Sequence, residues 1–468
     1  MTYIGKKGYT ILKSSLTDDE ILKIKRELTV RPVSQLQLQN RCFAKRSSSD
    51  SPYQQLTTKC GAPIDFSKSF PVYRESLKKI YVPRFYGVKN YGNSHFKEDC
   101  SVDIDVPFKG NLRENQIPAV ESFKGTGLLE LECAYGKTVI ALNIISKFRK
   151  KTIVIVHKEF LMNQWIERIR QFLPTARIGK IQGNVIDIEE KDIVIGMLQS
   201  LSMKTFDEKL FDSFGLTIVD ECHHISSEVF SCALFNIVTP FVLGLSATME
   251  RKDGTTYVIK MFLGDVCFKG KNQIHHEVLV KGITFIERNN SEFNTVMTDY
   301  KGNVQYSKMI SKLCSYQPRS DFVINVLKSV FSSNPSQQIM VLAHNKSLLN
   351  YIFQSIESND DFTVGFYVGG MKLEDLRKSE SKSIILATYS MASEALDIKT
   401  LSTLVMATPK TDIEQCVGRI LRQKNISTPL VIDIIDDHNP FKNQWRKRKT
   451  FYKQKGYQIL ETTNETFF

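Results

Sequence analysis

The sequence predicts an α/β protein with two successive parallel sheets, preceded by a segment of different character. Short runs rich in β-branched residues recur between stretches with a helical pattern of apolar residues. Such alternation is typical of parallel sheets whose crossover helices cover both faces. A chain of 468 residues is also too long for one compact core. We therefore expect two α/β lobes.

The expected strands define the domain boundaries. In the first series they lie at Gly127–Glu132, Thr152–Val156, Asp192–Ile195, Leu216–Val219 and Phe241–Leu245, with a helix at Phe160–Phe172. In the second series they lie at Ile339–Leu342, Thr363–Tyr367, Ser383–Ala387, Leu404–Ala407 and Leu430–Ile434. These runs place one lobe at residues 106–270 and the other at residues 321–468, which includes a basic tail. Residues 271–320 are expected to connect the lobes.

Residues 1–105 are expected to form an accessory domain that binds nucleic acid. Ser14–Val30 has the pattern of a short amphipathic helix, and Ser34–Lys59 is a polar stretch typical of a loop. Tyr81–Tyr91 is aromatic and basic, and either base stacking or core packing would explain it. The sequence does not assign a fold to this region.

The charge distribution indicates a polyanionic partner. The formal net charge is +13, and residues 1–110 contain 19 basic against 11 acidic residues. Phe441–Tyr457 adds seven basic residues and no acidic one. In that segment Phe441, Trp445, Phe451 and Tyr452 recur at near-helical spacing. We expect these aromatic side chains to pack a last helix onto the second lobe, and the intervening Lys and Arg to contact phosphates.

The cysteines and the hydropathy pattern indicate an intracellular, reducing environment. The nine cysteines are scattered without a CxxC pair, which argues against a disulfide framework and against a zinc ribbon. No apolar run approaches the length of a membrane span, and the first residues lack a secretory signal. No membrane association is expected.

A phosphate-binding loop is predicted between the strand Gly127–Glu132 and a helix at Val139–Phe148. Backbone N–H groups would receive phosphates, Lys137 would reach the β and γ groups, and Thr138 would ligate Mg²⁺. The residues of this loop are Cys133, Ala134, Tyr135, Gly136, Lys137 and Thr138. Leu131 stands where the full pattern has glycine, so an ordinary helix start is the alternative.

Two further strands end in polar residues. After Leu216–Val219, Asp220 is expected to hold Mg²⁺ through water and Glu221 to orient the attacking water, whereas a solvated turn is the alternative. His223 is expected to couple this site to a bound strand and not to hold a metal ion, because no second ligand cluster accompanies it. After Phe241–Leu245, the hydroxyl-bearing Ser246, Ala247 and Thr248 would make the same link.

The second lobe is expected to contribute arginines. On a helix, Gln415, Arg419 and Arg422 would share one face at positions i, i+4 and i+7. Two guanidinium groups and an amide on one face suit a γ-phosphate held by the other lobe. A surface helix with solvated arginines is the alternative.

Taken in order over about residues 112–435, these segments resemble the superfamily 2 helicases. The resemblance implies two tandem RecA-like lobes that bind ATP and Mg²⁺. It implies that Arg113 and Gln116 read adenine, that residues 220–223 are a DExH box, and that Asp397 faces the nucleotide. Gln199-Ser200 resembles an element that contacts the bound strand. Residues 393–394 (SE) depart from the family pattern, in which glycine is common.

Residues 246–254 (SATMERKDG) are similar to the group that contains the xeroderma pigmentosum B repair helicase. The tail and the N-terminal region resemble the poxvirus-type transcript-release helicases of large cytoplasmic DNA viruses. This implies 3′-to-5′ movement on single-stranded or duplex DNA and a role in viral transcription with the transcription machinery, or in repair. It also implies the cytoplasmic virus factory, or the virion, as the location.

Three other functions remain open. The protein could be a double-strand translocase or annealing motor that does not unwind DNA. It could be a helicase directed to RNA or to RNA–DNA hybrids. It could also be a nucleic-acid-binding transcription factor that uses ATP only as a switch, although Glu221, Gln415 and the two arginines argue against this function.

Overall fold

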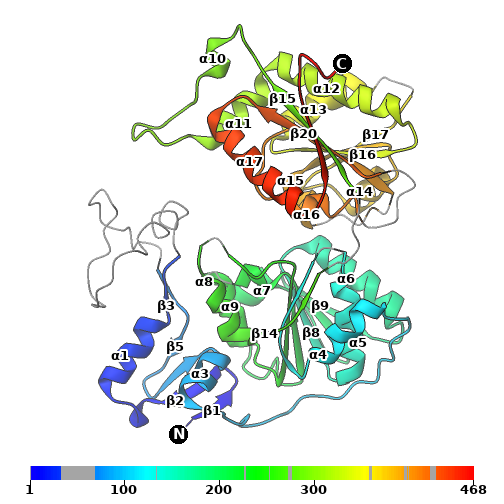
Figure 1. The fold of residues 1–468 in the computed structure, drawn as a ribbon. Helices are drawn as coiled ribbons and strands as arrows, with labels where there is room; N and C mark the ends of the chain where they lie inside the picture. Colours follow the sequence, from blue (N-terminus) through cyan, green and yellow to red (C-terminus); the bar gives the residue numbers. More distant parts are fainter. Residues whose placement is uncertain are drawn as a thin grey trace. The chain divides into compact units, whose positions relative to one another are not determined.

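The computed structural model describes residues 2–32, 69–132, 134–225, 228–251, 253–271, 277–357, 361–394, 398, 400–421 and 428–468. The chain divides into two compact units, Met1–Lys271 and Asn272–Phe468, each with its own sheet and hydrophobic core (Figure 1). The polar stretch Ser34–Lys59 lies outside the described residues. Within the described ranges, no helix has both the length and the apolar character needed to cross a bilayer.

An eight-stranded sheet forms the centre of the lobe in the first unit, in the order β10-β9-β11-β8-β12-β13-β7-β14. Its strands are β7 (Thr126–Leu131), β8 (Thr152–Val156), β9 (Ile178–Gln182), β10 (Val185–Asp187), β11 (Ile193–Met197), β12 (Leu216–Val219), β13 (Phe241–Ser246) and β14 (Val266–Gly270). All neighbouring strands are parallel except β9 and β10. The expected α/β class is confirmed, and the five strands expected here lie within two residues of their predicted ends.

Helices cover both faces of this sheet, which explains why its central strands are apolar without alternation. Val154 and Val156 of β8 pack in one core with α4 (Ile117–Ser122), α5 (Lys137–Phe148) and α6 (Glu159–Phe172). Ile153 and Ile155 face the opposite core, with α7 (Leu198–Met203), α8 (Glu228–Asn236) and α9 (Thr256–Leu263). The side chains of β8 are therefore buried on both sides of the sheet.

Residues 2–32 and 69–100, called the N-terminal module below, carry a separate antiparallel sheet in the order β1-β2-β6-β5. Its strands are β1 (Thr2–Gly5), β2 (Gly8–Leu12), β5 (Arg74–Glu75) and β6 (Lys79–Val82), and a short pair is formed by β3 (Thr29–Val30) and β4 (Phe70–Pro71). The expected amphipathic helix is α1 (Asp18–Glu27), which begins with a capping box between Thr17 and Glu20. The module has its own small core, which includes Ile11 and Ile80.

The segment Tyr81–Tyr91 is divided between a strand and a helix. Its first residues belong to β6, and Arg84–Tyr91 form α3. Tyr86 is buried in the core of the module, and its hydroxyl donates a hydrogen bond of 2.6 Å to Glu27 Oε2. Core packing therefore accounts for Tyr86, whereas Tyr81 stays half-exposed on the sheet.

The second unit has a seven-stranded parallel sheet in the order β17-β18-β16-β19-β20-β15-β21. Its strands are β15 (Leu279–Phe285), β16 (Gln338–Ala343), β17 (Val364–Tyr367), β18 (Ile384–Thr388), β19 (Leu401–Met406), β20 (Leu430–Asp436) and β21 (Gln458–Thr463). Its helices are α10 (Ser291–Asn294), α11 (Tyr306–Ser315), α12 (Gln317–Ser333), α13 (Lys346–Ile356), α14 (Leu373–Glu380), α15 (Tyr389–Glu394), α16 (Glu414–Val417) and α17 (Asn439–Gln454). The second series of expected strands is present in full.

The structure corrects the expectation that residues 271–320 only connect the lobes. β15 lies inside the sheet of the second unit, paired with β20 on one side and β21 on the other. The strand includes Lys281 and Gly282, so its sequence lacks a continuous β-branched run. Gly282 is needed there because a Cβ would lie 2.8 Å from the ring of Trp445.

The last helix packs as expected, with one exception among its basic residues. Phe441, Trp445 and Tyr452 of α17 are buried against the second sheet, and Phe451 is half-buried. Arg448, which the sequence assigned to phosphate contacts, is only 1% exposed and forms a bidentate ion pair with Asp433. The exposed basic residues of α17 are therefore fewer than the sequence suggests.

Candidate functional site

Three predicted motifs converge because they follow three adjacent parallel strands. β7, β13 and β12 are neighbours in the first sheet, and each pair is parallel. β7 leads into the predicted phosphate loop, β13 into residues 246–248, and β12 into residues 220–223. The carboxyl ends of parallel strands share one edge of a sheet, where ligands of open α/β sheets bind. The first unit therefore gathers these motifs at one edge.

The loop before α5 has the backbone that a phosphate cradle needs. Gly136 has φ +92°, in the left-handed region, and Ala134 has φ +63°. A Cβ at Gly136 would lie 2.2 Å from Gln116 Nε2, so a larger residue cannot fit there without displacing Gln116. Leu131 replaces the usual first glycine because it is the fully buried last residue of β7. Cys133 lies outside the described residues.

Arg113 and Gln116 donate hydrogen bonds to backbone carbonyls of this loop. Gln116 is 2% exposed, and its Nε2 donates a hydrogen bond of 2.9 Å to the carbonyl of Tyr135. Arg113 Nη2 donates to the same carbonyl at 2.7 Å and to that of Ala134 at 3.2 Å. The side chain of Tyr135 is buried and donates to the carbonyl of Asn115. The predicted adenine-reading residues thus contact the loop directly.

α5 begins at Lys137, followed by Thr138, and no side chain caps its N-terminus. The first N–H groups of a helix have no partner within the helix, and the helix dipole favours an anion at that end. Lys137 Nζ lies 3.4 Å from Glu221 Oε1, across the edge of the sheet from β7 to β12. The predicted lysine and the predicted acidic motif are therefore in contact.

Asp220 and Glu221 are both half-buried but are placed differently. Asp220 accepts a hydrogen bond of 2.8 Å from Trp165 Nε1 and one of 3.0 Å from the backbone N–H of Glu221. Burial raises the pKa of Asp220, and the neighbouring Glu221 adds to the rise. Burial also opposes ionisation of Glu221, but attraction by Lys137 and His223 outweighs it and lowers the pKa of Glu221. Glu221 has φ +46°, which indicates a strained turn.

A polar chain joins the acidic motif to the end of β13. His223 Nδ1 lies 3.0 Å from Ser246 Oγ, and Ser246 exchanges hydrogen bonds with the backbone of Thr248. Ala247 is half-buried in the turn between them. Arg251 donates a hydrogen bond to the carbonyl of His223. The predicted coupling residues of the first unit therefore form one connected group.

The sequence did not predict that Trp165 and Arg251 belong to this site. Trp165 lies on α6, and no spacing relates it to Asp220. Arg251 follows Ser246-Ala247-Thr248 closely, and its ion pair with Asp253 at the short spacing Arg-x-Asp is the one signal that could have identified it. Gln199 lies close to the same edge, because its Nε2 donates a hydrogen bond of 3.0 Å to the carbonyl of His157, directly after β8.

In the second unit the expected arginine helix is shorter than predicted. α16 ends at Val417, and the N–H groups of Arg419 and Ile420 bond to carbonyls three residues earlier. Gln415 and Arg419 are half-buried, and Arg419 Nε donates a hydrogen bond of 2.9 Å to the carbonyl of Ala392 on α15. This bond joins the arginine segment to α15, which lies directly before Asp397 in the sequence. Arg422 and Asp397 lie outside the described residues, as do the side chains of residues 393–394.

The first unit fits a nucleoside triphosphate with Mg²⁺. An uncapped helix start, Lys137 and a left-handed glycine suit phosphates, and Asp220 with the Thr138 hydroxyl supplies the oxygen ligands that Mg²⁺ prefers. Glu221 Oε2 is buried and accepts no hydrogen bond from the described residues, although His223 Nδ1 lies 3.5 Å away. A buried oxygen without a donor beside a phosphate loop is a natural acceptor for a water molecule.

Comparison with known proteins places this geometry in a family. Residues 109–251 match the model described as "Type III restriction enzyme, res subunit". The protein named "Putative ATP-dependent RNA helicase L396" of Acanthamoeba polyphaga mimivirus is 31% identical over 98% of this chain and 86% of its own length. The protein named "Putative ATP-dependent RNA helicase QP509L" of African swine fever virus (isolate Pig/Kenya/KEN-50/1950) is 29% identical over 72% of this chain and 70% of its own.

A solved structure agrees on the fold. Dbp5 of S. cerevisiae, bound to RNA and ADP BeF3, matches with a TM-score of 0.51 and 12% identity, covering 72% of this chain and 85% of its own. At that identity the likeness concerns the fold alone, two α/β lobes of the RecA-like kind. The mimivirus relative shows that this chain belongs to the ATP-dependent superfamily 2 helicases, the family that includes these proteins of large DNA viruses.

Proposed function

We propose that the protein is an ATP-driven motor that moves 3′ to 5′ on DNA. In this proposal ATP and Mg²⁺ bind at the edge of the first sheet where β7, β13 and β12 end. The observation that carries this proposal is the contact between Lys137 and Glu221 beside an uncapped helix start, with Asp220 directly before Glu221. Each of these groups has a known use in phosphoryl transfer to water.

The nucleotide roles follow from the positions of the side chains. Lys137 binds the β- and γ-phosphates, and Thr138 and Asp220 hold Mg²⁺, Asp220 partly through water. The metal ion neutralises charge on the phosphates when it is bound. Glu221, with its pKa lowered and with an Oε2 that accepts no hydrogen bond from the described residues, orients the attacking water and accepts its proton. Arg113 and Gln116 place the loop and read adenine.

The second unit is proposed to supply the groups that bind the γ-phosphate. We assign this role to Gln415, Arg419 and Arg422, and assign Asp397 to the nucleotide, because the order and spacing of these residues resemble the family motifs. An arginine that stabilises transition-state charge is worth about 10³–10⁵ in rate. The hydrogen bond from Arg419 to the carbonyl of Ala392 supports a link between the arginine segment and the segment that leads to Asp397, through which hydrolysis would be transmitted.

Coupling to the track is assigned to the polar chain of the first unit. His223, Ser246 and Thr248 join the acidic motif to the turn after β13, and a change at the γ-phosphate would be passed along these hydrogen bonds. Residues 220–223 are accordingly proposed as a DExH box, and residues 246–254 as support for the subgroup of the xeroderma pigmentosum B helicase. Opening one base-pair step costs about 1–2 kcal/mol, which one hydrolysis can cover.

DNA is proposed as the track, and transcript release or termination in viral transcription as the role. The resemblance of the tail and N-terminal module to transcript-release helicases supports both, with repair as the alternative. RNA is the second candidate track, because the names of the mimivirus and African swine fever virus relatives describe RNA helicases. ATPase rates with single-stranded DNA, duplex DNA and RNA, measured side by side, decide between them.

The split of roles between the units is tested by two substitutions. Lys137→Ala should lose ATP binding and turnover, whereas Arg419→Ala should bind ATP normally and lose nearly all turnover. Arg288→Ala is the matched control, because its exposed pair with Glu465 is worth little. ATP binding is measured with a fluorescent analogue and turnover as phosphate release at saturating nucleic acid. Normal stimulated turnover in Arg419→Ala would contradict the proposal.

A further inference from the structure

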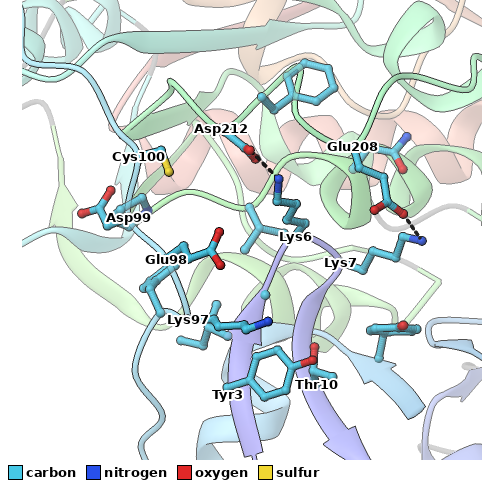
Figure 2. Close-up of a pocket in the computed structure, with 18 of the residues that line it drawn as sticks. Tyr3, Lys6, Lys7, Thr10, Lys97, Glu98, Asp99, Cys100, Glu208 and Asp212 are labelled. Atoms are coloured by element: carbon cyan, nitrogen blue, oxygen red, sulfur yellow. Dashed lines mark hydrogen bonds and ion pairs between the residues drawn. The ribbon is translucent and has the colours of Figure 1, made fainter. Parts of the chain in front are cut away.

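A hollow of about 260 Å³ lies between the sheet of the N-terminal module and the lobe of the first unit (Figure 2). The module side contributes β1, β2 and β6 together with residues 96–100, and the lobe side contributes residues 208–214 and 236–240. The hollow is distinct from the nucleotide edge described above, since none of the residues that line it belongs to the predicted nucleotide motifs.

Two tyrosines form the aromatic part of this hollow. Thr10 on β2 pairs with Tyr3 on β1 and with Tyr81 on β6, so the three residues form a row on one face of the sheet. Their neighbours Tyr9 and Ile80 are buried on the other face, in the core of the module. Strands lie about 4.8 Å apart, so the backbones at Tyr3 and Tyr81 are separated by roughly 10 Å, with the small Thr10 between them.

Lysines gather over these two rings. Lys79 Nζ and Lys97 Nζ lie 5.7 Å and 5.9 Å from the centroid of the Tyr3 ring, and Lys7 Nζ lies 5.9 Å from that of Tyr81. Within the described part of the chain, neither Lys79 nor Lys97 is within ion-pair distance of a carboxylate. An anionic group beside the Tyr3 ring would be attracted by both ammonium groups.

Four carboxylates line the hollow, Glu98 and Asp99 from the module and Glu208 and Asp212 from the lobe. Asp212 is paired with Lys6, and Glu208 pairs with Lys7 at 2.7 Å. Figure 2 shows both of these pairs at the end of the hollow opposite Tyr3 and Lys97. Lys6 and Lys7 therefore offset the two lobe carboxylates, so Lys79 and Lys97 are the lysines of the hollow that remain for an anion among the described residues.

We propose that this face of the N-terminal module binds single-stranded nucleic acid, with bases stacked on Tyr3 and Tyr81 and phosphates held by Lys79 and Lys97. The chemistry of recognition is a polyanion whose flat aromatic groups are exposed, which a single strand offers and a duplex does not. This proposal depends on the proposed function only in requiring that the protein binds nucleic acid. It adds a second contact site, apart from the nucleotide edge of the first unit.

The test measures the affinity of the full chain for labelled oligonucleotides by fluorescence anisotropy without ATP. The double variant Tyr3→Leu/Tyr81→Leu should bind single strands about tenfold more weakly, whereas Tyr3→Phe/Tyr81→Phe should bind like the wild type because phenyl rings still stack. Thermal melting of both variants checks that the module stays folded. If the Leu variant binds as the wild type does, or the Phe variant loses as much affinity, the proposal is overturned.

The lysines are tested through the salt dependence. Lys79→Ala/Lys97→Ala should weaken binding and lower the slope of log K against log salt by about 1–2, since two phosphate contacts are lost. Lys89→Ala, an exposed lysine on α3 outside the hollow, is the matched control and should leave the slope unchanged. An unchanged slope in the double variant would contradict phosphate contact.

Three oligonucleotides separate the possible ligands and the two proposals. Single-stranded DNA and single-stranded RNA show which strand the hollow prefers, and an effect of the tyrosine variant that is as large on blunt duplex DNA as on single strands overturns base stacking. ATPase stimulation of the wild type by the same oligonucleotides tests the proposed motor function. A wild type without stimulated ATPase would refute the motor, while the comparison of tyrosine variants would still decide the hollow.

Discussion

The substitution Arg448→Met tests whether α17 is held to the second sheet by a buried ion pair. Arg448 and Asp433 are each 1% exposed. Arg448 donates Nε to Asp433 Oδ2 at 2.7 Å and Nη2 to Oδ1 at 2.8 Å, and its Nη1 donates to the carbonyl of Lys410 at 2.8 Å. Tyr452 adds a hydroxyl hydrogen bond of 3.1 Å to Asp433. Methionine retains the apolar stem and removes three donated hydrogen bonds.

The expected loss of stability follows from what is left behind. Without the guanidinium, the Asp433 carboxylate stays buried with one hydroxyl donor, and the Lys410 carbonyl loses its side-chain donor. Removing one partner of a buried ion pair costs about 3–5 kcal/mol, mainly because the other charge is uncompensated. With a urea dependence of about 2 kcal/mol per molar, the unfolding midpoint of the second unit should fall by roughly 2 M.

Tryptophan fluorescence can follow the second unit by itself. The chain has two tryptophans, Trp165 in the first unit and Trp445 on α17. In a Trp165→Phe background, Trp445 alone reports unfolding of the second unit in urea. The variant and its parent are compared in that background, because Trp445 packs 5.7 Å from the Arg448 guanidinium and its baseline signal will change.

The pH dependence and a second variant make the reasoning refutable. Burial raises the pKa of Asp433 even with Arg448 present, and loss of Arg448 should raise the pKa further. The folded variant then binds a proton more tightly than the unfolded chain, so its stability deficit should be small near pH 4 and grow as pH rises toward the raised pKa. The variant Asp433→Leu/Arg448→Met should recover most of the stability. A deficit independent of pH, or no recovery, would refute the argument.

Two further substitutions test the loop and the attachment of the N-terminal module. Gly136→Ala should weaken ATP binding at least tenfold without unfolding the protein, because its Cβ would displace Gln116. Gly92→Ala, which is also at positive φ but in open space, is the control. Normal nucleotide binding in Gly136→Ala would count against a phosphate cradle at this loop. Arg84→Met should speed proteolytic release of the module, because Arg84 Nη1 donates to the carbonyls of Thr239 and Pro240, and burial among these groups lowers its pKa to about 10. Release at the wild-type rate would show that Arg84 does not hold the module.

The sequence predicted the strands of both sheets best where they are buried on two faces. Thr152–Val156 and Leu216–Val219 have continuous apolar runs, and the structure has strands with those bounds. β15 and β21 were missed because they contain Lys281 or Glu461 and lie toward or at the edge of their sheet, where polar residues are tolerated. Their position depends on pairing with distant strands, which a local pattern does not encode.

The site was predicted where a motif follows a strand directly. Lys137, Asp220 and Ser246 could be placed together because strands of one parallel sheet end at one edge. Trp165 could not be placed, since its contact with Asp220 depends on how α6 packs across the sheet. The sequence did not predict that Arg448 is buried, because nothing in a basic segment shows which of its residues has a buried acidic partner.

The position of β15 also has a consequence for how the second unit assembles. Ile283 pairs with Ile434, about 150 positions later in the chain, so β15 must wait for its neighbour β20. Ordering so long an intervening segment before the contact forms is entropically unfavourable, and such topologies fold slowly. During synthesis, the first unit can therefore complete its sheet while β15 of the second unit still lacks a strand neighbour. A ribosome stalled shortly before residue 430 would carry a first unit with its sheet complete and a second unit with β15 still unpaired on the β20 side.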